Sequence, residues 1–163
     1  MFGARFSAML IAAAVAVTAL PRPSCAFDIV PFLGTWVLDA GQSNFQFDQP
    51  LKSSTISTLR LGDGLVRCTA DSVEADGKSA QHVEFSTTFS GKPDATSGSA
   101  YFDSVINRPI NATSYKTVFL KGGRQVETQY HIIAKDGKTL RVVEAASDIG
   151  GRSWNYDLVF RRQ

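Results

Sequence analysis

The fold is decided by the stretch Leu65–Phe89, which reads LVRCTADSV, EADGKS and AQHVEFSTTF. Apolar and polar side chains alternate along both arms with a period of two, which is the pattern of half-buried strands. Between the arms, Asp76-Gly77 is a hairpin signal, because glycine accepts the positive φ that a tight turn requires. The stretch therefore predicts two antiparallel strands that share one apolar face.

The same pattern continues on both sides of this hairpin. Short alternating runs separated by turn residues predict strands at Leu33–Asp39, Ser54–Leu61, Leu65–Val73, Ala80–Phe89, Tyr101–Asn107, Thr113–Leu120, Arg124–Ile133, Leu140–Ser147 and Ser153–Arg162. Ser90–Ser99 is rich in glycine, serine and proline and is expected to be a surface loop, and residues 108–111 a turn around Pro109. Because most connections are short, neighbouring strands should pair antiparallel. The fold class is thus all-β, an up-and-down meander of eight or nine strands that closes into a barrel and leaves no exposed edge.

The charge balance excludes two classes of partner. The chain has 163 residues, with 17 Lys+Arg and 15 Asp+Glu. Residues 1–26 hold Arg5 and Arg22 and no acidic residue, so residues 27–163 carry no formal net charge. A neutral body without a Lys/Arg cluster argues against nucleic-acid binding, which needs a basic face, and against a polybasic anchor at a membrane surface. Residues 27–163 are enough for a single domain with one core.

Residues 1–26 have the order of a secretory signal peptide. The uncharged run Ala8–Leu20 follows Arg5, prolines break it, and small residues Ser24 and Ala26 precede a predicted cut before Phe27. The run would span about 20 Å as a helix, too short for a hydrocarbon core of about 30 Å. We therefore expect an exported protein, periplasmic or secreted, with no stable membrane span after signal removal. An uncleaved anchor and lipidation at Cys25 are the alternatives.

Cleavage after Ala26 would leave Cys68 as the lone cysteine, so no internal disulfide is expected. A cysteine in a strand is usually buried and inert, and this is the expectation for Cys68. A reactive thiol is the alternative.

Parity along each strand assigns the face that points into the barrel. The inward set on this basis is Val66, Cys68, Ala70, Val83, Phe85, Phe89, Val126, Tyr130, Ile132, Trp154, Tyr156, Leu158 and Phe160. The opposite parity places Glu127, Gln129, His82 and His131 outside. A regular strand would also turn Glu144 inward. Since a buried carboxylate needs a partner or a raised pKa, a strand end at the barrel mouth or a bulge is expected there instead.

An eight-stranded barrel has room for its own side chains or for one small ligand. The aromatic inner wall therefore allows two interpretations, a packed core or a cavity for a small apolar ligand. The candidate ligand-binding residues in the barrel interior are Phe85, Phe89, Phe119, Tyr130, Trp154 and Tyr156.

The segment Phe32–Asp39 (FLGTWVLD), followed by Ser43-Asn44-Phe45, resembles the start of small secreted bacterial β-barrel proteins of the lipocalin-like group. The likeness continues through Glu74–Lys78, Ala134–Leu140 and Val159–Arg162. The resemblance implies a lipocalin-like barrel. In the wider group the tryptophan of a Gly-x-Trp motif packs at the closed end under an arginine from the end of the chain. This implies a barrel closure made by Gly34, Trp36 and Arg162. Arg162 is preferred to Arg161 because it shares parity with Trp154 and Phe160, and a Trp36 that is a core residue only is the alternative.

The sequence offers little catalytic chemistry. It has no Gly-x-Ser-x-Gly elbow, no glycine-rich phosphate loop before a helix, and no His/Cys/Asp spacing of a zinc or iron site. No catalytic residue, cofactor or metal is therefore expected. Three hypotheses remain: a non-enzymatic carrier of a small apolar ligand, a structural or protein-interaction module of the cell envelope with a side-chain-filled barrel and a patch near residues 90–99, and an enzyme that uses Glu144 in a mouth pocket.

Overall fold

The computed structural model describes residues 27–46, 50–147 and 153–163, and these form a closed antiparallel barrel. A short 3-10 turn, η1 (Val30–Phe32), precedes the strands. The strands are β1 (Gly34–Leu38), β2 (Ser53–Gly62), β3 (Leu65–Val73), β4 (Ala80–Thr87), β5 (Pro93–Ser97), β6 (Ser104–Asn111), β7 (Ser114–Lys121), β8 (Arg124–Ile133), β9 (Thr139–Ser147) and β10 (Ser153–Arg162). Each strand pairs with the next, and β10 pairs with β1. The predicted signal peptide, residues 1–26, lies outside the described residues and stays a prediction.

The predicted up-and-down barrel is confirmed, but the described residues form ten strands and not eight or nine. The additional strand is β5, which lies in the segment expected to be a surface loop. β5 is short and pairs with β4 only at Glu84↔Ser97 and Phe85↔Thr96, so it leaves little alternation in the sequence. The expected turn at residues 108–111 is also wrong, because β6 continues through Pro109 opposite Tyr115 and shifts register only after it.

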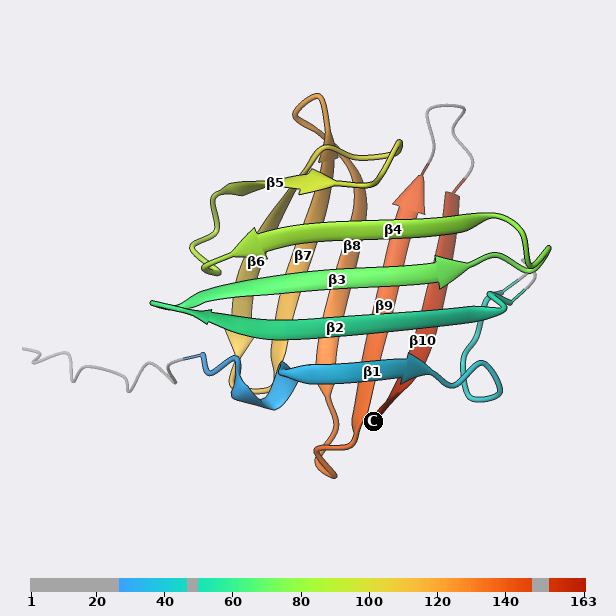
Figure 1. Ribbon diagram of the computed structural model, residues 1–163, viewed down its shortest axis with the longest axis horizontal. Coiled ribbons are helices and arrows are strands. Elements are labelled where there is room, and N and C mark those ends of the chain that lie inside the picture. The colour runs from blue at the N-terminus through green and yellow to red at the C-terminus, as the bar shows by residue number, and fades with distance from the viewer. Residues whose placement is uncertain (1–26, 47–49, 148–152) are drawn as a thin grey trace, which may run out of the picture.

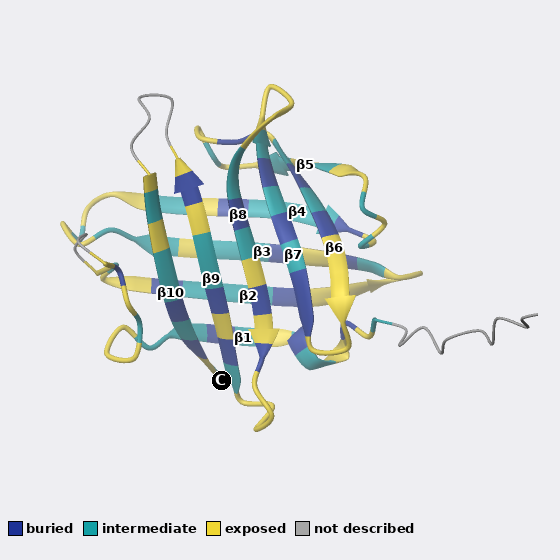
Figure 2. Cartoon of the chain, turned by 180° about the vertical axis from the view of Figure 1, so that it is seen from behind, coloured by how far each residue is buried: buried dark blue, intermediate teal, exposed yellow. Residues whose placement is uncertain are grey.

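Two layers of strands enclose the interior. In Figure 1, β1–β4 run across the front and β7–β10 run steeply behind them, so the layers cross as in orthogonally packed sheets. Figure 2 shows buried residues alternating with exposed ones along β9, as a strand with one inward face requires. The larger cluster of core side chains includes Phe32, Trp36, Tyr115 and Phe160.

One end of the barrel is closed by Arg162 and Trp36. The two residues are register partners across β1 and β10, and the Arg162 guanidinium lies 4.2 Å from the centre of the Trp36 ring. Arg162 Nη1 donates to the carbonyl of Leu33 and Nη2 to that of Pro31, both at 2.6 Å. Trp36, which is 0% exposed, donates from Nε1 to the carbonyl of Phe32 at 2.9 Å. These bonds hold η1 across the end of the barrel.

Gly34 fits this closure for a steric reason. Its φ is 108°, in the left-handed half of the map, and a Cβ there would lie 3.3 Å from Arg162 Nη1. A side chain at this position would therefore be strained and would crowd the guanidinium. The structure thus brings together Gly34, Trp36 and Arg162, with Trp36 both in the core and under the cation.

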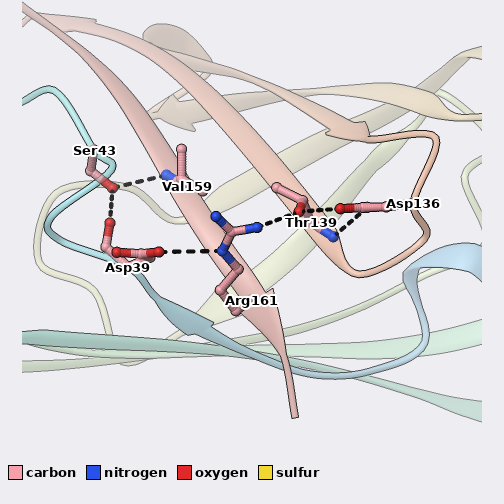
Figure 3. A network of polar contacts seen from close by, with 6 residues as sticks. All are labelled: Asp39, Ser43, Asp136, Thr139, Val159 and Arg161. Atoms are coloured by element: carbon pink, nitrogen blue, oxygen red, sulfur yellow. Dashed lines mark hydrogen bonds and ion pairs between the residues drawn. The ribbon is translucent and has the colours of Figure 1, made fainter.

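A second set of polar contacts ties β1 and β10 on the outside of the barrel (Figure 3). Arg161 donates to Asp39 Oδ2 at 3.2 Å and to the Thr139 hydroxyl at 2.7 Å, and that hydroxyl donates to Asp136 at 2.8 Å. Ser43 donates to the Asp39 carbonyl and accepts the Val159 N–H. These groups are exposed or partly buried, so water competes with their interactions.

The two neighbouring arginines should differ in their effect on stability. Arg162→Ala removes the stack on Trp36 and three charge-assisted hydrogen bonds, to the carbonyls of Pro31, Leu33 and Gly137, and should lower the free energy of unfolding by about 2–4 kcal/mol. Arg161→Ala removes exposed contacts and should cost less than about 1 kcal/mol. Urea unfolding followed by circular dichroism measures both. Equal losses for the two variants would contradict the closure described above.

Candidate functional site

The barrel interior is tightly packed at the closed end and partly exposed at the other. Inward-facing Trp36, Phe160, Val142 and Val66 are at most 1% exposed. Towards the opposite end, inward-facing Phe85, Gln129, Glu144, Trp154 and Tyr156 keep partial exposure, whereas Val105 and Phe119 are buried in a second cluster of core side chains. Solvent therefore reaches these inward-facing side chains, which it does not reach at the closed end. We call this region the open half, and it is the candidate binding site.

A row of polar residues crosses the inner wall of the open half. Strand pairing aligns Asn107, Thr117, Gln129, Glu144 and Tyr156 on five consecutive strands, β6 to β10. The next row towards the open end is Val105, Phe119, Glu127, Ala146 and Trp154. The row on the other side contains Tyr115, His131, Val142 and Leu158. The polar row thus lies between two rows that are mainly apolar.

The inward face of β8 is the opposite of the predicted one. Tyr130 and Ile132 point outward and are 39% and 36% exposed, while Glu127, Gln129 and His131 pair with inward residues of β7 and β9. The Lys116 ammonium lies 5.6 Å from the centre of the Tyr130 ring on the outer face. Tyr130 is therefore not a residue of the barrel interior.

Two features of β8 explain why the alternation of apolar and polar residues predicted the wrong inward face. A register shift opposite Phe119 and Leu120 breaks the pairing near Val126, so one parity does not hold along the whole strand. The strand also has isoleucines in both phases, and it is Ile133, opposite Leu140, that joins the core of the closed end. Burying Ile133 turns Gln129 and His131 inward.

Glu144 faces the interior with partners on both sides, and the expected strand end or bulge is wrong. The register of β9 runs without a break through Glu144 on both neighbours. Trp154 Nε1 donates to Glu144 Oε1 at 3.0 Å, and Gln129 Nε2 donates to Glu144 Oε2 at 3.2 Å and to Glu127 Oε1 at 2.6 Å. The inward parity of Glu144 was visible in the sequence, but its partner Gln129 was assigned to the outer face.

Burial determines the titration of this cluster. Burial, and then the nearby Glu144 carboxyl, raise the pKa of Glu127 to about 8. Burial also raises the pKa of Glu144, although the hydrogen bonds from Trp154 and Gln129 act in the opposite direction. Glu127 therefore holds its proton at neutral pH in the folded protein.

Several buried polar atoms in the same barrel have no hydrogen-bond partner among the described residues: Asn107 Nδ2, Asp94 Oδ2 and His131 Nδ1. Asn107 is 1% exposed and accepts from Thr117 at 2.7 Å, so its oxygen is satisfied and its amide nitrogen is not. Asp94 lies on β5 opposite Val105, diagonal to Asn107 on the same face. Buried atoms of this kind are uncommon in native proteins.

The wall of the open half has a lateral hollow between β4 and β5. Its volume is about 540 Å³, and it is lined by Glu84, Phe85 and Ser86 together with residues 93–97. The lining includes residues of both parities, among them Phe85 and Asp94, which face inward. The hollow therefore reaches interior side chains from the side of the barrel.

The other predicted aromatic residues divide between the two halves. Phe119, Trp154 and Tyr156 face inward in the open half, as does Phe85. Phe89 lies after β4 with a φ of 56° and packs 5.0 Å from the rings of both Phe27 and Tyr115, so it belongs to the packed end. The residues that sequence reasoning missed are the polar ones: Asp94, Asn107, Thr117, Glu127 and Gln129.

Buried groups at the closed end are poorly suited to chemistry. Cys68 is 6% exposed, which confirms the expected burial, and burial raises its thiol pKa to about 12, which disfavours the reactive thiolate. His131 stacks on Tyr115 with the ring centres 4.4 Å apart, and burial lowers its pKa to about 3. The expectation that His131 lies outside is therefore wrong, whereas His82 is exposed and contacts Asp71 at 2.7 Å. The described residues include no group of three His, Cys, Asp or Glu side chains that could hold a metal ion.

Comparison with known proteins identifies the class of fold. No sequence-family model and no curated protein sequence matches the chain. Among solved structures, the wild-type fluorescent protein UnaG is similar with a TM-score of 0.54 and 13% identity, over 83% of this chain and 100% of UnaG. Zebrafish ileal bile acid-binding protein complexed with cholic acid is similar with a TM-score of 0.50 and 13% identity, over 82% of this chain and 99% of that protein. The protein thus has a closed antiparallel β-barrel similar in fold to these two proteins. Within the described residues, no helix is long and apolar enough to cross a membrane.

The raised pKa of Glu127 predicts a pH-dependent effect of Glu127→Gln. An acid whose pKa is higher in the folded state than in the unfolded state destabilises the fold as the pH rises from the unfolded-state pKa to the folded-state pKa. The glutamine does not titrate, so Glu127→Gln does not lose this stability. The difference in free energy of unfolding, Glu127→Gln minus wild type, should rise by up to about 1.4 kcal/mol per pH unit between about pH 5 and about pH 8. Urea unfolding at both pH values measures the gain.

The matched control is Glu84→Gln, whose carboxylate lies on the outer face 3.6 Å from Arg67. A difference between wild type and Glu127→Gln that stays constant over this pH range would show that Glu127 does not titrate from a buried position.

Proposed function

We propose that this chain is an exported, non-enzymatic barrel that binds a small apolar ligand in the open half of its interior. The observation that carries the proposal is the contrast between the two ends. Inward-facing Trp36 and Phe160 have almost no exposure, whereas inward-facing Trp154, Tyr156 and Glu144 remain partly exposed. A packed floor beneath an accessible, mainly apolar space is the usual form of a ligand site.

The composition of the walls supports an apolar ligand. The strands β2–β4 contribute Ile56, Ala70, Val83 and Phe85. Ala70 is the register partner of Ile56 and of Val83, and Phe85 follows Val83 on the same face of β4. β7 and β10 contribute Phe119, Trp154 and Tyr156 from the other side. Few polar groups interrupt these apolar walls. The walls would supply the affinity for a ligand, and the few polar groups would set its orientation. The similarity in fold to a bile acid-binding protein complexed with cholic acid supports the same reading.

A non-enzymatic role is supported by the state of the nucleophiles and bases. The Cys68 thiol is buried, with a pKa of about 12, and His131 is stacked on Tyr115 with a pKa of about 3. Glu144 already accepts hydrogen bonds from Trp154 and Gln129. These arrangements favour holding a ligand over activating one.

Filling the open half should abolish binding. Ala70 faces inward between Ile56 and Val83, and Ala70→Phe would place a ring in the proposed site. The full chain should enhance the fluorescence of N-phenyl-1-naphthylamine, a neutral apolar probe. The affinity of Ala70→Phe for the probe should fall at least about tenfold, which corresponds to about 1.4 kcal/mol.

The matched control is Thr69→Phe, since Thr69 lies one residue away on the outer face, between Ser57 and Glu84. Its probe affinity should equal that of the wild type, and circular dichroism checks that both variants fold. No uptake of the probe by the wild-type chain would refute the proposed function.

Export rests on the order of residues 1–26 and has its own test. Expression with the complete amino terminus in a bacterial host, followed by amino-terminal sequencing of the purified protein, should give Phe27 as the first residue. A chain that keeps residues 1–26 and remains in the cytosolic fraction would contradict export without affecting ligand binding.

A further inference from the structure

Another hollow lies on the outside of the barrel, across β6, β7 and β8, which Figure 2 shows from their outer side. Thr117 and Phe119 of β7 face inward and are buried, so the residues between and beside them face outward. The hollow has a volume of about 300 Å³, and we call it the outer groove. It is lined by Ile106, Arg108, Lys116, Val118, Leu120 and Gln125.

The outer groove is charged at one end and apolar along most of its length. It follows β7 from Lys116 to Leu120, a distance of about 13 Å along a strand. Arg108 is the register partner of Lys116, so the two cations lie side by side at one end. Ile106 and Val118 are also register partners, and together with Leu120 they form the apolar floor. A charged end joined to an apolar floor fits an amphiphilic ligand.

Local contacts hold the side chains of both cations. Arg108 lies against the bare backbone of Gly91, where a Cβ would come within 3.3 Å of Arg108 Nε. The Lys116 ammonium lies 5.6 Å from the centre of the Tyr130 ring. Neither cation forms an ion pair with any described residue. The two charges are therefore held in place and remain available to an anion.

This face of the barrel is locally positive, although residues 27–163 carry no formal net charge. Within the described strands β6, β7 and β8 there is one carboxyl group, that of Glu127, and it faces inward. Like charges directly opposite each other on neighbouring strands repel, so the adjacent positions of Arg108 and Lys116 cost stability. An anion between the two side chains would replace this repulsion with attraction.

We propose that the outer groove binds a small amphiphilic anion, with its anionic head between Arg108 and Lys116 and its apolar body along Val118 and Leu120. A guanidinium and an ammonium donate charge-assisted hydrogen bonds to a carboxylate, and the apolar floor supplies the burial of a short chain. The inference goes beyond the proposed function, because the outer groove and the open half lie on opposite faces of β7.

The dimensions of the outer groove favour a single small molecule. Its volume of about 300 Å³ lies at the lower end of the range for small-ligand sites. Two cations at one end match one head group, whereas attachment to an anionic membrane requires a cluster of cations spread over the face. A medium-chain carboxylate has the required head and length.

Three ligands of one chain length test the proposal through the charge of the head: octanoate, octanol and octylammonium. Each is titrated below its micelle concentration, at about neutral pH, into the isotopically labelled full chain and followed by NMR. The amide signals of Ile106, Val118 and Leu120 report the outer groove, and those of Ala70 and Phe85 report the interior. Octanoate should bind the outer groove with an affinity at least about fivefold higher than octanol, and octylammonium should bind least tightly.

Charge-removing variants locate the selectivity. Arg108→Gln and Lys116→Gln should each weaken the binding of octanoate to the outer groove, and the double variant should bind octanoate no more tightly than octanol. Both side chains reach the surface, so the fold should persist, which circular dichroism checks. The matched control combines Lys135→Gln and Lys138→Gln, at two exposed lysines between β8 and β9. It makes the same change in net charge and should keep the wild-type preference.

Several results would overturn the proposal. They are equal affinities of the outer groove for octanoate and octanol, a preference for octanoate that survives in the double variant, and octanoate-induced shifts confined to the interior signals. Binding to phosphatidylglycerol vesicles without binding of monomeric octanoate would assign this face to a membrane and overturn it too. Ala70→Phe fills the interior and should leave octanoate binding at the outer groove unchanged, so this inference and the proposed function can fail separately.

Discussion

The stack of Arg162 on Trp36 is the contact on which the rest of the barrel depends. It joins the first and last strands of the sheet where they must meet to close, and its hydrogen bonds hold η1 over the end. Since the indole is completely buried beneath the cation, this end can be filled with Phe32, Phe160 and Leu140. A dry, fixed floor in turn allows the other half to remain accessible without loss of the fold.

The interior therefore combines two environments within one cylinder. The closed end is aromatic and aliphatic, and its few polar groups, such as His131, are held neutral by burial. The open half carries carboxyl groups, amides and an indole N–H that bond to one another across β8, β9 and β10. Polar groups of this kind cost stability unless they have partners, and here Gln129 and Trp154 supply partners for the two carboxyl groups.

Sequence reasoning identified the barrel and much of its lining because alternation is strict where one face is fully apolar. Val66, Cys68 and Ala70 on β3, and Trp154 to Phe160 on β10, follow it without exception. It failed on β8, where Tyr130 and Ile132 are apolar but outward, and where a register shift near Val126 breaks the parity. It also missed β5, which has only five residues and contains a proline. The polar half of the site escaped prediction because hydrophobicity was the only guide to the inner face, and the inner face there is partly polar.

The connection of β1 to β10 has a consequence for how the chain acquires its structure. Trp36 and Arg162 are neighbours in the sheet although roughly 125 residues separate them along the chain. All the other strand pairs form between consecutive hairpin arms, so they can assemble progressively, whereas this seam requires a long loop to be closed against its entropy. The free edge of β1 stays available to other chains until β10 arrives, which makes the unsealed cylinder the species most prone to aggregate.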